Sequence, residues 1–472
     1  MEGGDWLIDL LMKEGASYAE VRFHRELDFG VILKNGTPET PEYGEAYGAA
    51  IRVICNGALA FASTNLTSKE QLSKAGMRAV RGAKAMSGVS KQVNFSPEAI
   101  QRQEWSEDCK EDPTKIDAAS ALELLRSIDS EILETKGVKF PNRLLVFGGS
   151  TEDKCYVNSE GTRITSKVPR VEGHFIITAF DPEKGTLQRV VQVGESGGWE
   201  RVGAMDPAGE VRREADGMAK VLLEGRHAPS ERHDVVVGGE VSGIMAHEAC
   251  GHPQEADRIM GREAAQAGES YVKAEMIGRR IGSSVVNISD NPSIPHSYGY
   301  YLYDDEGVRA KKKELMKAGV ITGFLHSRET AHEFGVFSNG AMRATSYARE
   351  PIIRMSNTYV EGGDFSLEEM LEDCRKGIYI KSFQEWNIDD MRWNNRYVGL
   401  EAYMISGGEI GAPIRSPIIE ATTQVIFSSV EAVGREVEFK AATCGKGQPS
   451  QDAPVWTGGP PMKMKGLLIK SR

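Results

Sequence analysis

Residues 234–253 have the sequence DVVVGGEVSGIMAHEACGHP, and this stretch predicts the core of the largest part of the chain. The apolar, β-branched run at its start is typical of a buried strand, and the glycine pair that follows predicts a turn. Three apolar residues then fall on one helical stripe: Val241, Ile244 and Met245. We therefore expect a strand, a turn and a helix that packs against the strand and carries the motif at the end of this stretch.

The hexad His247-Glu248-Ala249-Cys250-Gly251-His252 places two imidazoles around a carboxylate. It has one residue more than the H-E-x-x-H motif of metallopeptidases. At roughly 100° per residue, the two histidines of a regular helix would lie about 140° apart instead of about 40°. Both can reach one metal ion if the helix widens locally as a π-type turn, or if it ends near Gly251. Gly251 and Pro253 favour such an ending, because glycine accepts unusual dihedral angles and proline cannot continue a helix.

Two imidazoles beside a carboxylate are typical of a catalytic zinc site, which has three protein ligands and one position for water. Glu248 would take a proton from that water as a general base. The third ligand must come from elsewhere in the chain. Cys444, between a strand end and a glycine turn, is the first candidate, with Lys446 nearby to favour its thiolate, and Cys250 is the second. The alternative interpretation is a helix with two unrelated histidines and an ordinary glutamate.

The fold class predicted from the patterns is α+β, with N-terminal α/β modules followed by a β-rich domain. Residues 1–90 form the first module, in which Asn56-Gly57 predicts a two-residue hairpin turn and residues 69–86 a helix. Residues 228–472 form the β-rich C-terminal catalytic domain, which carries the metal-binding helix.

Residues 91–227 form a central α/β module between these two parts. It begins with a helix predicted over residues 117–135, where apolar residues recur at helical spacing. Short strands follow, separated by turns at 158–161 and 181–185. The predicted strands are 143–147, 154–157, 163–165, 175–180 and 187–193.

Composition excludes several classes of function. The chain has 472 residues and a formal net charge of −11, which works against a nucleic-acid partner, because phosphate binding needs a concentrated basic face. We find neither an apolar stretch long enough to cross a membrane nor the pattern of a secretion signal at residues 1–6, so we expect a cytoplasmic protein without membrane contact. The six cysteines lack C-x-x-C spacing and are expected to be reduced thiols.

Several motifs together carry a family resemblance that covers essentially the whole chain. In this order and spacing they resemble the TldD branch of the TldD/PmbA family. The motifs are Asn158-Ser159-Glu160-Gly161, the hexad with Glu255-Ala256-Asp257, Tyr303-Asp304-Asp305-Glu306-Gly307-Val308, Met355-Ser356-Asn357-Thr358-Tyr359 and Thr443-Cys444-Gly445.

The resemblance implies a zinc-dependent metallopeptidase that acts on unfolded or extended peptides inside a dimer. It implies that His247, His252 and Cys444 bind Zn²⁺ and that Glu248 is the catalytic carboxylate. The other branch of the family lacks the hexad and serves as a non-catalytic partner. We therefore expect a homodimer, or a heterodimer with a hexad-lacking relative. The peptide substrate would be held as an added β-strand, because main-chain hydrogen bonds bind any extended peptide.

Three further expectations concern the surroundings of the site. Residues 383–395 depart from the family pattern, so they either line the substrate path or form a surface loop. His296 and Tyr298 are candidates to contact substrate or stabilise the oxyanion. Asp304-Asp305-Glu306, before a glycine, are typical of a solvated turn. The alternative function is a non-catalytic regulatory or binding protein of the same family, in which the metal is structural.

Overall fold

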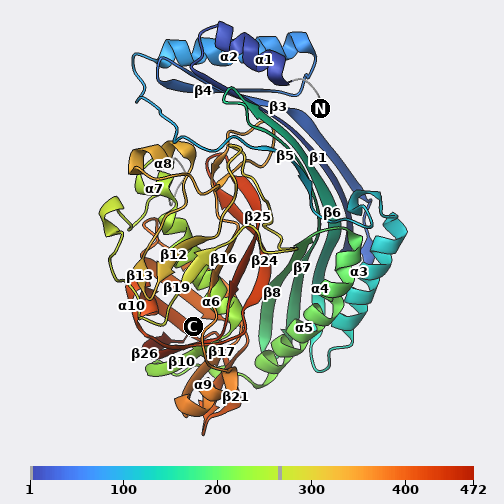
Figure 1. Ribbon diagram of the computed structural model, residues 1–472. Helices are drawn as coiled ribbons and strands as arrows, with labels where there is room; N and C mark the ends of the chain where they lie inside the picture. The colour runs from blue at the N-terminus through green and yellow to red at the C-terminus, as the bar shows by residue number, and fades with distance from the viewer. Residues whose placement is uncertain (1–3, 264–267, 472) are drawn as a thin grey trace.

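The computed structural model describes residues 4–263 and 268–471 (Figure 1). In the N-terminal part of these residues, one strongly curved eight-stranded sheet arcs around the C-terminal domain, with the order β4-β3-β1-β6-β7 and β8 paired to β7. The strands are β1 (Tyr18–Lys34), β2 (Thr37–Pro38), β3 (Glu42–Cys55), β4 (Ala58–Thr64), β5 (Arg102–Ser106), β6 (Lys139–Asn158), β7 (Arg163–Asp181) and β8 (Gly185–Ser196).

The hairpin between β3 and β4 confirms the turn predicted from sequence. Asn56 and Gly57 both have positive φ, 49° and 79°, as a two-residue turn of this kind requires. Cys55 pairs with Ala58 on either side of the turn. The register of β3 against β4 is therefore set by a local sequence signal.

The short strands predicted in the central module are wrong in length. The segments expected at 143–147 and 154–157 belong to the single strand β6, which continues through Gly148 and Gly149. A Cβ on Gly148 would lie 2.0 Å from the carbonyl oxygen of Phe29 on β1. These glycines therefore allow close approach of neighbouring strands within a long curved sheet, and they do not end the strand.

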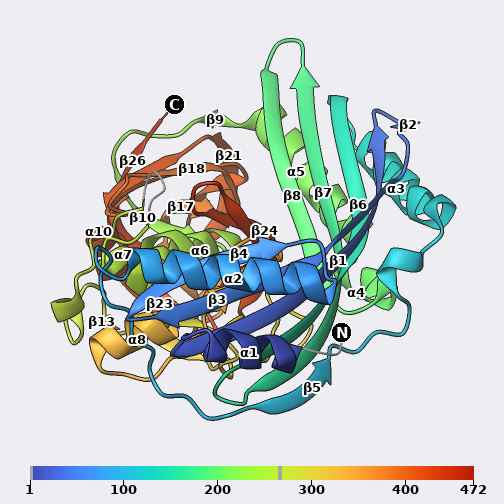
Figure 2. The ribbon, with the colours of Figure 1, turned by 90° about the horizontal axis from the view of Figure 1, so that it is seen from above.

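Helices cover the curved sheet at its two ends (Figures 1 and 2). At one end α1 (Gly4–Lys13) and α2 (Lys69–Met86) bury Leu7, Leu11 and Leu72 against β1 and β3. At the other end lie α3 (Ala118–Leu133), α4 (Val202–Met205) and α5 (Pro207–Glu224). The predicted helix at 69–86 is confirmed, and the one predicted at 117–135 is observed with slightly shorter ends. Among the described residues, no helix is long and apolar enough to cross a membrane.

The C-terminal domain contains two larger sheets within the described residues. A ten-stranded sheet comprises β9 (Arg226–His227), β10 (Arg232–Val237), β17 (Lys376–Ile380), β18 (Phe383–Ile388), β19 (Asn394–Gly399), β20 (Ala402–Ser406), β21 (Glu409–Arg415), β22 (Ile418–Thr422), β23 (Val430–Val433) and β26 (Met462–Lys470). A six-stranded sheet comprises β11 (Ile288–Asp290), β12 (Lys313–Lys317), β13 (Val320–Ile321), β16 (Asn357–Val360), β24 (Glu438–Lys446) and β25 (Gln451–Gly459).

The strand, turn and helix predicted at 234–253 are present and lie at the centre of this domain. Strand β10 is buried between β26 and β17, and α6 (Gly239–Ala246) follows it. The helix packs across β16, β24 and β25 of the six-stranded sheet. Smaller elements complete the domain: the pair β14 (Met342–Arg343) and β15 (Ile352–Ile353), and the helices α7 (Ala256–Ile259), α8 (Arg328–Phe334), α9 (Leu367–Cys374) and α10 (Thr423–Ser428).

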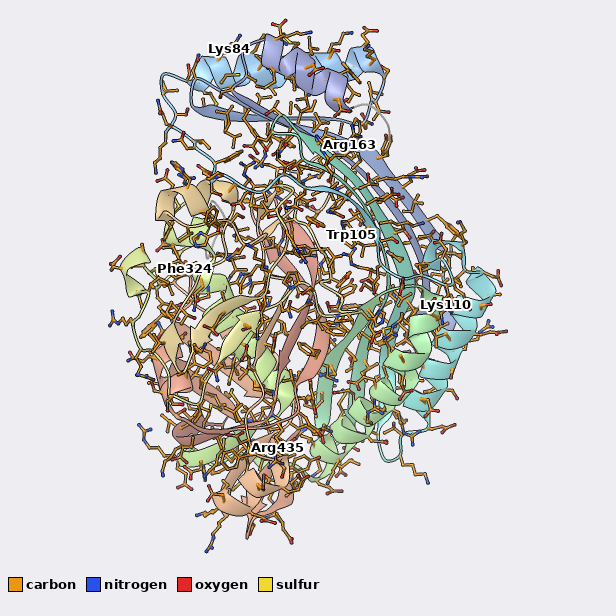
Figure 3. The ribbon with its side chains drawn as sticks, in the orientation of Figure 1. Lys84, Trp105, Lys110, Arg163, Phe324 and Arg435 are labelled. Carbon is orange, nitrogen blue, oxygen red and sulfur yellow. The ribbon has the colours of Figure 1, made fainter. Side chains whose placement is uncertain are left out.

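Side chains fill the space between the curved sheet and the C-terminal domain (Figure 3). Trp105 on β5 meets the ring of Tyr300 there, with centroids 6.0 Å apart. Charged groups are buried at the same interface, where Arg52 on β3 donates to Glu20 at 2.7 Å and to Glu306 at 2.8 Å.

The solvated turn expected at Asp304-Asp305-Glu306 is wrong. All three carboxylates are buried, with 6%, 5% and 2% of their surface exposed. Asp305 lies 3.0 Å from Lys154, and Glu306 accepts from Arg52, so both carboxylates form ion pairs with residues of the N-terminal sheet. Asp304 accepts from backbone N–H groups of its own loop. The acidic run thus joins the two parts of the molecule.

Replacing Arg52 tests this interface. Arg52→Met leaves Glu20 and Glu306 buried without their shared cation, so we expect a loss of about 3–5 kcal/mol in the free energy of unfolding. Thermal unfolding measures the change. Arg25→Met is the matched control, because its ion pair with Glu45 is exposed, and the expected loss there is about 1 kcal/mol or less. Equal losses in the two variants would contradict a buried ionic interface.

Candidate metal centre

The hexad forms a widened helical turn directly after α6. Residues His247 to Gly251 are a π-helix, in which the N–H of His252 donates to the carbonyl of His247. A 3-10 turn that includes Pro253 follows. A Cβ on Gly251 would lie 2.0 Å from the sulfur of Met355, so any other residue here would force the Met355 side chain to move. Of the two local geometries predicted from the spacing, the structure therefore adopts the widened one.

This turn brings both histidines to one cysteine. The Nε2 atoms of His247 and His252 each lie 3.3 Å from the Sγ of Cys444, on β24. The three candidate ligand atoms lie within 4.8 Å of one another, and all three residues are buried. A tetrahedral zinc site with bonds of about 2.3 Å to sulfur and about 2.0 Å to nitrogen needs sulfur and nitrogen about 3.5 Å apart. The donor set and its spacing therefore fit a zinc ion.

A carboxylate behind His252 orients this imidazole. Glu255 accepts from His252 Nδ1 at 3.1 Å and from Arg258 at 2.6 Å. Because a carboxylate only accepts, the proton lies on Nδ1, and Nε2 keeps its lone pair toward the cluster. Burial alone would raise the pKa of Glu255, but Lys446, His252 and Arg258 hold it well below its usual range.

The thiol of Cys444 is activated by groups other than the expected lysine. Burial raises the pKa of Cys444, but His252 and Arg354 lower it more, and the pKa falls to about 7. Arg354 is fully buried and donates to the backbone carbonyl of Cys444. Lys446 points instead to Asp257, at 2.7 Å, and to Glu255, at 3.3 Å. The sequence offers no local signal for Arg354.

Cys250, the second candidate for the third ligand, belongs to the hydrophobic core. It is fully buried, and this burial raises the pKa of its thiol well above the usual range. Cys250 therefore packs within the hydrophobic core of the domain, and the cluster takes its sulfur from Cys444.

Glu248 is buried, and both oxygens of its carboxylate accept hydrogen bonds. The indole Nε1 of Trp386 donates to its Oε1 at 3.1 Å, and a guanidinium N–H of Arg392 donates to its Oε2. Burial raises the pKa of Glu248, but His252, Arg392 and His247 outweigh this effect and lower it. The carboxylate is therefore ionised. Both partners come from the segment 383–395, to which the sequence assigned no contact with the hexad.

The cluster and Glu248 line a cavity of about 400 Å³. Its walls come from two edge strands and one hairpin: Val190 to Gln192 on β8, Lys440 to Cys444 on β24, and side chains of the segment 383–395. Gln192 donates to the hydroxyl of Thr443 at 2.9 Å, so β8 and β24 meet across the cavity. The segment 383–395 thus lines the space beside the metal cluster.

The two candidates for substrate contact, His296 and Tyr298, lie elsewhere. Tyr298 is buried, donates to Glu172 and lines a separate polar cavity of about 480 Å³. His296 lies 2.9 Å from Glu107 of the N-terminal part. Neither residue lines the cavity that contains His247, His252 and Cys444.

Comparison with known proteins gives matches over nearly all of the chain. The model of the PmbA/TldA metallopeptidase C-terminal domain matches residues 230–471, the model of domain 1 matches residues 19–87, and the model of the central domain matches residues 111–223. The matched ranges include the hexad and Cys444.

Curated relatives and solved structures agree with these matches. A metalloprotease of Methanocaldococcus jannaschii is 29% identical over 96% of both chains. A zinc metalloprotease TldD homolog of Saccharolobus solfataricus is 31% identical over 52% of this chain and 53% of its own. TldE from Thermococcus kodakarensis has the same fold, with a TM-score of 0.75, 18% sequence identity and coverage of 98% of this chain and 99% of its own.

Metal analysis of Cys444→Ser tests the candidate centre. The wild type is expected to purify with bound metal, and loss of the thiolate should greatly reduce the metal content, because the histidines alone supply two ligands. Elemental analysis of the purified proteins measures this. Cys109→Ser is the control, since Cys109 is an exposed free thiol. Unchanged metal content in Cys444→Ser would remove this residue from the centre.

Proposed function

The chain belongs to the TldD/PmbA metallopeptidase family, and we propose that it is a zinc-dependent peptidase that cleaves unfolded or extended peptides. One observation carries this proposal. His247, His252 and Cys444 lie within 4.8 Å of one another and share a cavity with the buried carboxylate of Glu248. This arrangement combines the three protein ligands of a catalytic zinc site with a candidate general base.

His247, His252 and Cys444 hold the metal in this mechanism. Two imidazoles and a thiolate favour zinc among the common metals, and a relative named as a zinc metalloprotease supports this choice. When bound, zinc would polarise the scissile carbonyl and lower the pKa of the attacking water.

Glu248 moves the proton in this reaction. Its carboxylate takes a proton from the attacking water and passes it to the leaving amine. Each of its oxygens already accepts one hydrogen bond, but a carboxylate oxygen has a second lone pair that can accept another. The hydrogen bonds of Trp386 and Arg392 therefore leave the base able to work.

The substrate binds as an added strand in the cavity. Strand β24 is the outer strand of the six-stranded sheet and carries Cys444, and β8 borders the curved sheet opposite it. An extended peptide along β24 would form main-chain hydrogen bonds and pass its backbone over the metal. A cavity of about 400 Å³ has room for an extended segment and not for a folded domain, so the substrates are unfolded segments or peptides.

We also propose that the enzyme works in the cytoplasm as a dimer, with a second copy or with a hexad-lacking relative of the same fold. Free cysteines throughout the described residues agree with a reducing compartment. Light scattering of the protein purified alone tests the homodimer, and a mass of one 51.7 kDa chain would exclude it. Microscopy of a tagged chain tests the location, and signal outside the cytoplasm would contradict it.

The alternative is a regulatory or binding protein with a structural metal. A structural zinc site has four protein ligands and no open position. In the described part of the chain, the potential ligands that gather here are His247, His252 and Cys444, which leaves one position for water. The three-ligand set favours catalysis.

Glu248→Gln separates the two functions. The amide cannot accept the proton, so cleavage of an unstructured fluorogenic peptide should fall by about 10²- to 10⁴-fold, with metal content unchanged. Initial rates and elemental analysis on the same samples measure both properties. Glu104→Gln, at an exposed position on β5, should behave as the wild type. Full activity of Glu248→Gln would contradict the role of Glu248 as the general base.

A further inference from the structure

A single hairpin holds both oxygens of the Glu248 carboxylate. Strands β18 and β19 are joined by the turn 389–393. Trp386 on β18 donates to Oε1 at 3.1 Å, and Arg392 in the turn donates to Oε2. Two donors at two oxygens define the plane of the carboxylate as well as its position.

The turn that carries Arg392 is anchored by backbone hydrogen bonds. The backbone N–H of Thr423 donates to the carbonyl of Trp393 at 2.8 Å. The hydroxyl of Thr423 donates to the carbonyl of Arg392 at 3.1 Å. On the other side, the N–H of Tyr271 donates to the carbonyl of Met391 at 2.8 Å. These three hydrogen bonds fix the backbone of the turn to Thr423 on one side and to Tyr271 on the other.

The same anchors connect the turn to the hexad. The hydroxyl of Tyr271 donates to the carbonyl of Ala249 in the π-helix at 3.2 Å. The ring of Tyr271 also packs against the ring of Trp393, with centroids 5.0 Å apart. Tyr271 therefore connects the turn directly to the helical segment that carries Glu248.

Arg392 occupies an unfavourable backbone conformation. Its φ is 62°, in the left-handed region that side chains other than glycine rarely adopt. Residues in such conformations persist where the surrounding structure holds them, and they concentrate at functional sites. Glycine or asparagine would fit this backbone more easily, so what arginine contributes at this position is its guanidinium group.

The Glu248 carboxylate lies where the metal cavity meets a second pocket. Glu248, Trp386 and Arg392 line both the metal cavity and a second, more open pocket that includes Asn387 and Ile388. The carboxylate therefore lies at the boundary of the two cavities, and both of its donors come from the wall that the cavities share.

We infer that Trp386 and Arg392 are positioning residues that hold the Glu248 carboxylate in its working orientation beside the metal cluster. This inference rests on the proposed function, in which Glu248 is the base. The rate of the chemical step depends on the placement of the base, whereas peptide binding along β24 does not. The segment that departs from the family pattern is thus a part of the catalytic apparatus of this chain.

Variants of Arg392 test the inference. Arg392→Gln removes the charged donor, so we expect kcat for the unstructured peptide to fall roughly 10- to 100-fold, with KM nearly unchanged. Arg392→Lys should recover part of kcat, because an ammonium can donate to the same oxygen. Added guanidinium ion should partly restore kcat in Arg392→Ala. Trp386→Phe keeps an aromatic ring but lacks the donor, and should show a smaller loss of kcat.

Arg396→Gln is the matched control on the same hairpin. Arg396 pairs with Glu385 at 2.6 Å and with Glu420 at 3.3 Å, so this variant removes the same charge away from Glu248. Its kcat should equal that of the wild type. Metal content and thermal unfolding are measured for every variant, so that a loss of kcat is separated from a loss of metal or of fold.

The outcomes divide clearly. Wild-type kcat in Arg392→Gln would overturn the inference. So would a loss that follows metal content, or one that neither lysine nor guanidinium relieves, because each assigns Arg392 a purely structural role. An inactive wild type would count against the proposed function itself, and that result is independent of all hairpin variants. A loss confined to kcat and relieved by lysine supports the positioning role.

Discussion

The hydrogen bond from the N–H of His252 to the carbonyl of His247, five residues earlier, is the constraint on which the metal centre depends. It widens the helix, so that two imidazoles that a regular helix would separate by about 140° reach the same sulfur atom. The widened turn is tightly packed at Gly251, where a Cβ would displace the Met355 side chain. The hexad has one residue more than the H-E-x-x-H motif, and the widened turn accommodates this extra residue.

The centre belongs to both halves of the molecule. The C-terminal domain supplies the hexad and β24, while β8 of the N-terminal curved sheet forms the opposite wall of the cavity. The width of this cavity depends on how the sheet sits against the domain. That placement rests on buried ion pairs such as Arg52 with Glu306 and Lys154 with Asp305. These ion pairs therefore contribute to the shape of the cavity, since buried ion pairs require defined geometry.

Much of the fold could be predicted because its signals are local. The Asn56-Gly57 hairpin and the helix at 69–86 follow from turn chemistry and apolar spacing within a few residues. The length of β6 could not, because Gly148 reflects the approach of a neighbouring strand more than 100 residues away in sequence. The acidic run at 304–306 failed for a similar reason: composition indicates solvent, but its cations come from the other half of the chain.

The sequence by itself determined the chemistry of the site: two imidazoles around a carboxylate, a spacing that requires either a widened helical turn or a helix end near Gly251, and cysteine as a candidate third ligand. These conclusions hold because helical geometry is a property of consecutive residues. Only the tertiary structure decided that Cys444 meets the histidines, that Arg354 lies behind this thiol, and that Trp386 and Arg392 hold Glu248. Those contacts depend on the register and packing of strands distant in sequence, which no local pattern records.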